Sequence, residues 1–304
     1  MAKRKPKGRN ISGIVLLDKP IGMTSNAALQ TVKRLFNASK AGHTGSLDPL
    51  ATGLLPLCLG EATKISGFLL DADKHYIATC KLGINTTTAD AEGEIISTRP
   101  VPSLDQARIE QVLEQFRGQI SQIPPMHSAI KQNGQPLYKL AHQGIEVERK
   151  PRDVHIYSLN LIRHNGDELE IAIHCSKGTY IRTLAEDIGE VLGCGAHLIG
   201  LRRTGSGPFS LEQAVSIETL QIKAEQGSAA LDTLLFPIEN ALLDWPTVKL
   251  SEDSAYYLQQ GQAIQIARAP TSGLVCLFKG EDVFLGIGQI LDDGRVAPKR
   301  LLRA

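Results

Sequence analysis

Cysteines in metal-ligand spacing are missing from this sequence. Its five cysteines form no CxxC pair, are odd in number and mostly lie among apolar neighbours. This pattern argues against a zinc site and against a disulfide framework, and it favours reduced thiols in a cytoplasmic protein. The cysteines are Cys58, Cys80, Cys175, Cys194 and Cys276.

Long apolar runs and a net charge are also lacking. No apolar segment approaches the ~20 residues that span a bilayer, and the basic residues 1–10 lack the apolar stretch of a secretory signal. We therefore expect a cytoplasmic protein with no membrane partner. The net charge of +1 does not by itself predict a polyanionic partner, although basic residues cluster locally. A nucleic-acid binder needs one positive surface rather than a positive total.

The composition that is present, with 42% hydrophobic and 21% charged residues, is that of an ordinary globular protein. A length of 304 residues suggests about two domains. Apolar periodicity and turn residues predict the main elements. Strands are expected at 11–17, 76–82, 93–97, 154–163, 169–175, 196–204, 263–267, 274–279, 283–290 and 296–302, and helices at 25–36, 61–70, 104–116, 137–142, 179–192 and 252–260, with two weaker ones between 211 and 243.

The stretch from Gly42 to Gly53 combines three glycines and a proline with one His and one Asp. Glycine and proline favour a tightly bent loop, and the apolar run that follows must be buried. Asp-Pro is common at helix starts, so the local pattern predicts that Asp48 caps a helix beginning at Pro49. A carboxylate on a rigid loop backed by core is also how an enzyme holds a reacting group still. Both interpretations remain open at this level.

Three motifs in order make the chain recognisable. They are KPIGMTS at 19–25, the run from Gly42 to Lys64, and KGTYIRT at 177–183. Together they resemble the bacterial TruB-type tRNA pseudouridine synthases, and the likeness covers almost the whole chain. The resemblance implies an α+β fold, with a catalytic domain built on a central mixed, largely antiparallel β-sheet flanked by helices. It also implies a small C-terminal PUA-like β-barrel domain.

The resemblance divides the chain into a basic tail at 1–10, a catalytic domain at 11–245 and an RNA-binding domain at 246–304. An RNA-gripping insertion is expected at about 124–152. Two departures fall in this insertion, where His127 replaces the more usual Tyr and His142 replaces the more usual Arg. They bear on how tRNA is gripped rather than on the chemistry.

The resemblance also implies an activity, the isomerisation of uridine 55 in the T loop of tRNA. Asp48 occupies the position of the catalytic aspartate, and Arg182 keeps that carboxylate charged. Tyr76 stacks on the flipped base and takes part in proton transfer, while His43, Tyr180 and Leu201 shape the pocket. Further RNA contacts are expected, with less support, from Lys19, Lys64, Lys131, Arg149 and Arg202, although Lys19 and Lys64 could equally support loops. Asp90 is a second carboxylate candidate, for which a structural role is favoured because turn aspartates usually cap backbone amides.

Pseudouridine formation breaks the N1–C1′ bond and rejoins uracil through C5, with no net redox change. We therefore expect no metal and no cofactor. The sequence leaves open whether Asp48 acts at C1′, at C6 or through a glycal. Two alternatives also stay open: an RNA-binding folding helper, whose tRNA-folding role is compatible with the enzyme, and a guide-RNA-dependent relative, against which the insertion argues. The expected partner is the T arm of tRNA, bound by a monomer without guide RNA.

Overall fold

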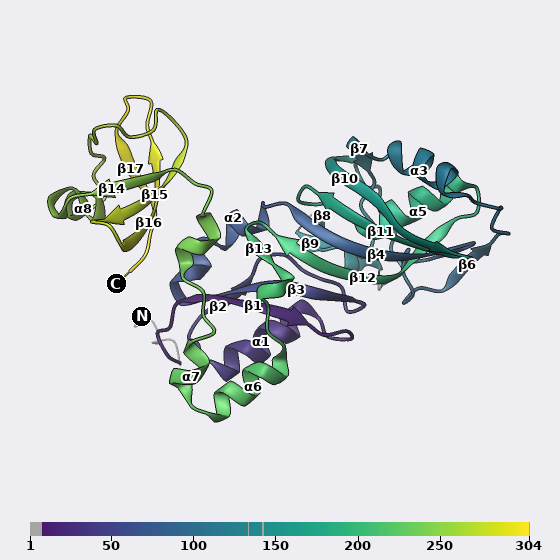
Figure 1. Cartoon of the computed structure of the whole chain (residues 1–304), viewed down its shortest axis with the longest axis horizontal. Helices are drawn as coiled ribbons and strands as arrows, with labels where there is room; N and C mark the ends of the chain where they lie inside the picture. The colour runs from purple at the N-terminus through teal and green to yellow at the C-terminus, as the bar shows by residue number, and fades with distance from the viewer. Residues whose placement is uncertain (1–7, 133, 142, 304) are drawn as a thin grey trace.

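A computed structural model describes residues 8–132, 134–141 and 143–303 (Figure 1). Its largest sheet has nine strands, seven of which follow the order β1-β3-β12-β4-β11-β10-β7, while β2 pairs with β3 and β13 with β12. Only β3 and β12 run parallel, so the sheet is mixed and largely antiparallel, as predicted. The strands are β1 (Gly13–Lys19), β2 (Ala41–His43), β3 (Ala51–Leu59), β4 (Lys74–Leu82), β7 (Gly118–Gln122), β10 (Arg152–Asn165), β11 (Glu168–Cys175), β12 (Ala196–Ser206) and β13 (Phe209–Ser210).

Helices cover the two ends of this sheet separately (Figure 1). One core cluster joins β4, β10, β11 and β12 to α3 (Gln106–Glu114) and α5 (Ile181–Leu192). Another joins β1 and β3 to α1 (Ser25–Leu35), α6 (Ile217–Glu225) and α7 (Ser228–Asp232). The Thr24 hydroxyl accepts a hydrogen bond from the Ala27 amide and so caps α1, a helix that the sequence predicted at 25–36.

A second, smaller sheet lies at the C-terminal end of the chain (Figure 1). Its four strands follow the order β14-β15-β16-β17, and α8 (Glu252–Gln259) packs beside them. They are β14 (Thr247–Leu250), β15 (Leu274–Lys279), β16 (Val283–Ile290) and β17 (Val296–Leu301). A core cluster joins this sheet to β1, β3 and the segment from η1 (Gly60–Lys64) to α2 (Ser66–Leu70), so the two sheets share apolar contacts.

The remaining short elements connect these layers. They are the hairpin β5 (Ile84–Thr86) and β6 (Ile95–Thr98), the segment β8 (Lys131–Gln132), β9 (Gln135–Pro136) and α4 (Leu137–Ala141), and the 3₁₀ turns η2 (Leu211–Gln213) and η3 (Ile238–Leu242). The β8–β9–α4 segment is the part of the predicted insertion that the structure describes with regular elements. His142, one of the two departures noted in this insertion, lies outside the described residues.

Three local predictions were wrong. Asp48-Pro49 begins no helix: Pro49 and Leu50 form a turn that leads directly into β3. The helix expected at 61–70 is divided into η1 and α2. Residues 263–267 contain no strand, only an isolated bridge between Ile264 and Val296, whereas β14 was not predicted. In each case the tertiary pairing outweighs the local pattern.

Candidate active site

The loop between β2 and β3 is fastened on both sides. The Ser25 hydroxyl donates to the Leu47 carbonyl at 2.9 Å and accepts from the Leu47 amide at 2.7 Å. The Thr44 hydroxyl donates to the Pro56 carbonyl at 3.2 Å. Gly45 takes a φ of +123°, which a side chain would strain. The loop is thus rigid where it presents Asp48, whose side chain is 45% exposed.

Arg182 joins Asp48 to a second carboxylate. Its Nε lies 3.0 Å from Asp48 Oδ2, and its Nη1 lies 3.3 Å from Asp90 Oδ2. The side chains of Arg182 and Asp90 are only 7% and 3% exposed. The guanidinium also donates to the carbonyls of Thr88 (3.2 Å) and His127 (2.8 Å), so its plane is held from several directions.

Asp90 is itself fixed by its own turn. Its Oδ1 accepts hydrogen bonds from the Thr88 hydroxyl at 2.5 Å and from the Glu92 amide at 3.0 Å. Asp90 therefore has the structural role that was favoured for it. It also has a second role, because its other oxygen, Oδ2, contacts Arg182. Asp90 is a positioning residue for the Asp48–Arg182 pair.

Two opposing effects act on the Asp48 carboxyl. Burial in the site raises its pKa above the ordinary value, and the positive charge of Arg182 lowers it. The negative charge of Asp90 adds to the rise, whereas Lys19 opposes it. The cation beside Asp48 therefore favours the ionised form of this carboxyl.

Asp48 and Arg182 line a cleft of about 740 Å³. The other residues predicted to be catalytic or to bind substrate line the same cleft; they are His43, Tyr76, Tyr180 and Leu201. The structure therefore brings all six together from four separate stretches of sequence.

Neighbouring strands supply one wall of the cleft. Tyr76 lies on β4 and Leu201 on β12, and both pack partly buried against the two main core clusters. Burial raises the pKa of the Tyr76 phenol. Tyr180 precedes α5, and its backbone amide donates to Gln122 Oε1 at 3.0 Å while Gln122 Nε2 donates to its carbonyl at 3.2 Å. This double contact fixes the start of the helix that carries Arg182.

His43 ends β2 at the edge of the cleft. Burial lowers the pKa of its imidazole, and the charge of Arg203 lowers it further, so the ring is neutral at pH 7. Its Nδ1 is buried and has no hydrogen-bond partner among the described residues. An unsatisfied buried nitrogen at the cleft edge fits a group that meets its partner in a ligand.

The lysines and arginines expected to contact RNA take several positions. Lys19 is fully buried, and its ammonium donates to the carbonyls of Pro20 (2.9 Å) and Met23 (2.6 Å), which is the loop-supporting alternative. Lys64 pairs with Glu61 and donates to the Leu301 carbonyl at 2.7 Å, so it joins the two sheets. Groups of the protein bind both ammonium groups, so neither is well placed to contact an RNA phosphate.

The other three differ in exposure. Arg149 donates to the Pro124 carbonyl at 3.2 Å and pairs with Glu146, so it closes the base of the predicted insertion. Arg202 pairs with Asp18 at 2.7 Å and remains 43% exposed. Lys131 is exposed on β8. Lys131 and Arg202 keep the accessible charge that a phosphate contact requires.

Sequence reasoning missed two buried cations in the cleft, Lys74 and Arg203. Arg203 directly follows Arg202, which was the predicted RNA contact. Side chains alternate along a strand, so Arg203, two residues after Leu201, shares the Leu201 face, and Arg202 points the other way. The same spacing places Lys74 with Tyr76 on β4. Period-two counting from Leu201 and Tyr76 could have found both.

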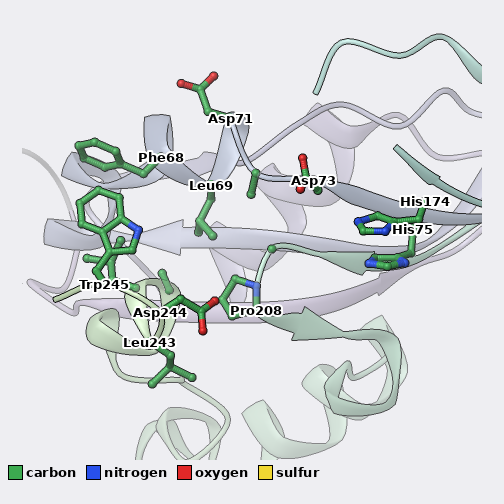
Figure 2. Close-up of a pocket in the computed structure, with 14 residues that line it drawn as sticks. Phe68, Leu69, Asp71, Asp73, His75, His174, Pro208, Leu243, Asp244 and Trp245 are labelled. Carbon is green, nitrogen blue, oxygen red and sulfur yellow. The ribbon is translucent and has the colours of Figure 1, made fainter. Parts of the chain in front are cut away.

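A second cavity of about 450 Å³ lies next to the cleft (Figure 2). Phe68, Trp245 and the stacked rings of His75 and His174 line it, together with several carboxylates. The ion pair between Asp71, which lines this cavity, and Lys177, which lines the cleft, separates the two hollows. Within it, Trp245, which lies between η3 and β14, packs edge-on against Phe68 of α2 at 5.0 Å.

No group of three or more residues that could hold a metal is found within 8–132, 134–141 and 143–303. Across the same described ranges, no helix is long and apolar enough to cross a membrane.

Solved structures identify the class of protein. Across 92% of this chain and 78% of the other, the structure resembles a chain of a Cbf5-Nop10-Gar1 complex with a TM-score of 0.72 and 28% identity. It also resembles a chain of an H/ACA RNP bound to a substrate RNA containing 2′-deoxyuridine, with a TM-score of 0.74 and 25% identity over 96% of this chain and 85% of the other. The fold is that of the pseudouridine synthases.

Sequence comparison narrows the class to one family. Residues 33–181 match the TruB family pseudouridylate synthase (N terminal domain), 182–243 the tRNA pseudouridylate synthase B C-terminal domain, and 246–302 the family described as Pseudouridine synthase II TruB, C-terminal. The chain is 58% identical to tRNA pseudouridine synthase B of Pseudomonas fluorescens over 100% of both chains. It is 55% identical to the protein of that name from Nitrosococcus oceani over 99% of this chain and 97% of the other. This chain belongs to the TruB family of pseudouridine synthases, and the resemblance seen in its motifs is confirmed.

Proposed function

We propose that this protein is a tRNA pseudouridine synthase that isomerises uridine 55 in the T loop, with Asp48 as the catalytic carboxylate. The observation that carries the proposal is the Asp48–Arg182–Asp90 arrangement at the cleft. A single carboxylate stands on a rigid loop beside a buried guanidinium, opposite a tyrosine that can face a flat base. The relatives named tRNA pseudouridine synthase B support tRNA as the substrate.

The reaction needs an anionic group next to the sugar and the base. Carboxylates serve glycosidic chemistry in this way generally. Asp48 is the half-exposed member of the pair, so it is available to the nucleoside, whereas Asp90 is buried behind Arg182. Of the two carboxylates that contact Arg182, only Asp48 has the accessibility that the chemistry requires. The proposal applies equally to action at C1′, at C6 or through a glycal.

The remaining cleft residues hold a base that has been extracted from the T loop. Tyr76 stacks on the uracil and takes part in proton transfer, and Tyr180 and Leu201 complete the walls. The neutral His43 ring lies against the rearranged loop nucleotides, where its free Nδ1 accepts a hydrogen bond. The apolar β3 strand behind the loop, with Leu54, Leu55 and Leu57 fully buried, keeps water from the detached base.

Binding of the T arm extends beyond the cleft. We assign the described part of the insertion at 124–152 and the C-terminal sheet to this contact, with Lys131 and Arg202 among the exposed cations. Residues 246–304 act as the RNA-binding domain. The protein works as a monomer in the cytoplasm without guide RNA or cofactor, and opening the T loop also helps tRNA to fold.

Release of tritium from a transcript labelled at C5 of uridine tests the proposal. The wild-type protein should release the label from a bare T-arm RNA, and Asp48→Asn should lower the rate by more than about 10³-fold. Asp167→Asn, which removes an exposed carboxylate paired with Lys81, is the matched control and should keep the rate. Retained turnover in Asp48→Asn would refute the catalytic assignment.

The same assay separates the alternatives. A folding helper would keep its effect on tRNA structure when Asp48 is replaced, because that role needs the grip and not the carboxylate. A guide-dependent enzyme would leave the bare T arm unmodified until a guide RNA is added. The guide-dependent alternative is worth testing because a structural relative is part of an H/ACA RNP bound to a substrate RNA. Turnover of the bare T arm without guide RNA would exclude this alternative.

A further inference from the structure

Arg203 lies at the floor of the cleft and is almost fully buried, with 1% of its surface exposed. Its Nε donates to the Leu54 carbonyl at 2.6 Å, and its Nη2 lies 3.3 Å from the Gly45 carbonyl. Gly45 belongs to the loop that presents Asp48, and Leu54 belongs to β3. The side chain therefore ties the catalytic loop to the central sheet.

Arg203 also stands directly opposite Tyr76. The two residues are register partners on the antiparallel strands β12 and β4, so their side chains share one face, and both line the cleft. The guanidinium also donates a hydrogen bond to the Tyr76 phenol. One side chain contacts the Asp48 loop and the strand that carries Tyr76.

The hydrogen bonds of the Arg203 guanidinium to the Leu54 and Gly45 carbonyls do not neutralise its charge. Among the described residues, neither Arg203 nor the neighbouring Lys74 forms an ion pair with Asp or Glu. Lys74 is 6% exposed, and its ammonium donates to the carbonyls of Leu69 (3.1 Å), Leu70 (3.4 Å) and Ala72. Arg182, by contrast, contacts two carboxylates. Because a buried charge without a counter-ion is costly, two such cations at one cleft indicate a site that receives negative charge.

We propose that Arg203 is a positioning residue for the isomerisation, which holds the Asp48 loop against the Tyr76 strand and supplies the positive charge that favours the detached uracil anion. This inference rests on the proposed function. Lys74 adds to the same positive floor but is held by its three carbonyls. Arg182 has the separate task of keeping Asp48 ionised.

The reaction explains why a positive charge is useful at the position of Arg203. When the N1–C1′ bond breaks, its electron pair leaves with the base, so the detached uracil carries one negative charge until a new bond forms. The C5–C1′ bond then forms with an electron pair from the base, the proton on C5 is lost to a base, and N1 takes up a proton, so the uracil ends neutral. No oxidant or reductant takes part. A fixed cation that costs no reorganisation stabilises the anionic intermediate and the transition states on either side of it.

Other titratable groups of the cleft respond to the same charge. Arg203 lowers the pKa of His43, Lys74 and Lys19, in each case after burial as the larger cause. Burial raises the pKa of the Tyr76 phenol. The charge of Arg203 and the hydrogen bond that it donates to the phenol oppose this rise. Removing the charge should therefore raise the pKa of the His43 imidazole, which gives a spectroscopic readout independent of turnover.

Single-turnover rates of Arg203→Gln and Arg203→Lys on a T-arm RNA test the inference. We expect the neutral variant to lose about 10²-fold in rate, while the dissociation constant for RNA changes by less than about threefold. The lysine variant keeps the charge and should stay within about tenfold of the wild type. Arg117→Gln is the matched control, because Arg117 also donates to a backbone carbonyl, that of Leu159, far from the cleft.

The possible outcomes distinguish a failure of the proposed function from a failure of the role assigned to Arg203. If the wild type forms no pseudouridine, the proposed function fails; if it does and Arg203→Gln keeps its rate, only the role of Arg203 fails. If Arg203→Gln does not fold, Arg203→Lys decides: a folded lysine variant that loses more than about 10²-fold in rate contradicts a role carried by charge. An unchanged pKa of His43 in a folded Arg203→Gln, followed by NMR, would contradict the electrostatic part.

Discussion

Arg182 binds Asp48 and Asp90 at once, with Nε at 3.0 Å from one carboxylate and Nη1 at 3.3 Å from the other. The two carboxylates differ in their surroundings. Asp48 is 45% exposed at the cleft, whereas Asp90 is 3% exposed and bound to its own turn. One guanidinium therefore connects a half-exposed carboxylate at the cleft to a buried structural one, and the position of the first depends on the second.

Asp90→Asn should weaken both stability and activity. Removal of one partner from a buried charge pair typically costs about 3–5 kcal/mol, and here it also leaves Arg182 held by one carboxylate. Urea denaturation and the single-turnover rate measure the two effects. Asp167→Asn is the control, since its exposed pair with Lys81 should contribute less than about 1 kcal/mol. Equal behaviour of the two variants would contradict the positioning role of Asp90.

Arg182→Gln should shift the acid limb of the pH–rate profile to higher pH. Burial raises the pKa of Asp48 and Arg182 is the largest cause that lowers it, so removing the arginine leaves the rise opposed only by the smaller effects of Lys19 and His127. The ionised carboxylate is the active form, and it would then be lost at a higher pH as the solution is acidified. Single-turnover rates between pH 5 and pH 8 locate the limb. A limb that stays at the wild-type position would show that Arg182 does not control the ionisation of Asp48.

Much of the scaffold could be predicted from local patterns, because its long elements are strongly periodic. The helix beginning at Ser25, the hairpin of β10 and β11 and the helix carrying Arg182 were all predicted to within a few residues. Short strands such as β7 and β14 were not, since four or five residues of mixed polarity carry little signal. Their pairing depends on partners far away in the sequence.

The candidate site was harder to predict from the sequence than the scaffold, because it depends even more on contacts between distant residues. Asp48-Pro49 looks like a helix start, yet the contacts of Ser25 with Leu47 and the pairing of β3 impose a turn and leave the carboxylate free for Arg182. Lys19 looks like a surface lysine and is fully buried. Arg202-Arg203 looks like one basic patch, although strand alternation sends one residue to an ion pair and the other into the cleft. Strand alternation could have separated Arg202 from Arg203, but no local pattern shows that Ser25 contacts Leu47 or that Lys19 is buried.

Lys19 should make stability depend on pH in the alkaline range. Burial lowers the pKa of its ammonium to about 8, from 10.5 in the unfolded chain. Between these values the unfolded state binds more protons than the folded state, so the free energy of unfolding rises with pH over this window. The full rise for one such group is roughly 3 kcal/mol.

Lys19→Met isolates this contribution. The difference in the free energy of unfolding between wild type and variant, measured in urea from pH 7.5 to pH 10.5, should move in favour of the wild type as pH rises. A difference that stays constant across the range would mean that Lys19 titrates alike in both states.

The C-terminal sheet should contribute to RNA affinity through exposed cations. Because its core is continuous with β1 and β3, removal of residues 250–304 would uncover apolar surface, and substitutions are the cleaner test. Lys299→Gln with Arg300→Gln, both exposed in the structure, should weaken binding of tRNA and reduce the slope of log Kd against log salt by about 1–2. Lys249→Gln, an ion-paired lysine of the same sheet, is the control. Unchanged affinity and slope in the double variant would remove these cations from the RNA surface.

Mapping of pseudouridine in total tRNA tests the central claim most directly. Cells that lack this protein are supplied with the wild type, with Asp48→Asn or with Asp167→Asn, and position 55 of the tRNA is then analysed by liquid chromatography and mass spectrometry. We expect pseudouridine at position 55 with the wild type and with Asp167→Asn, and uridine there with Asp48→Asn. Pseudouridine at position 55 with Asp48→Asn, or its absence with the wild type, would contradict the account.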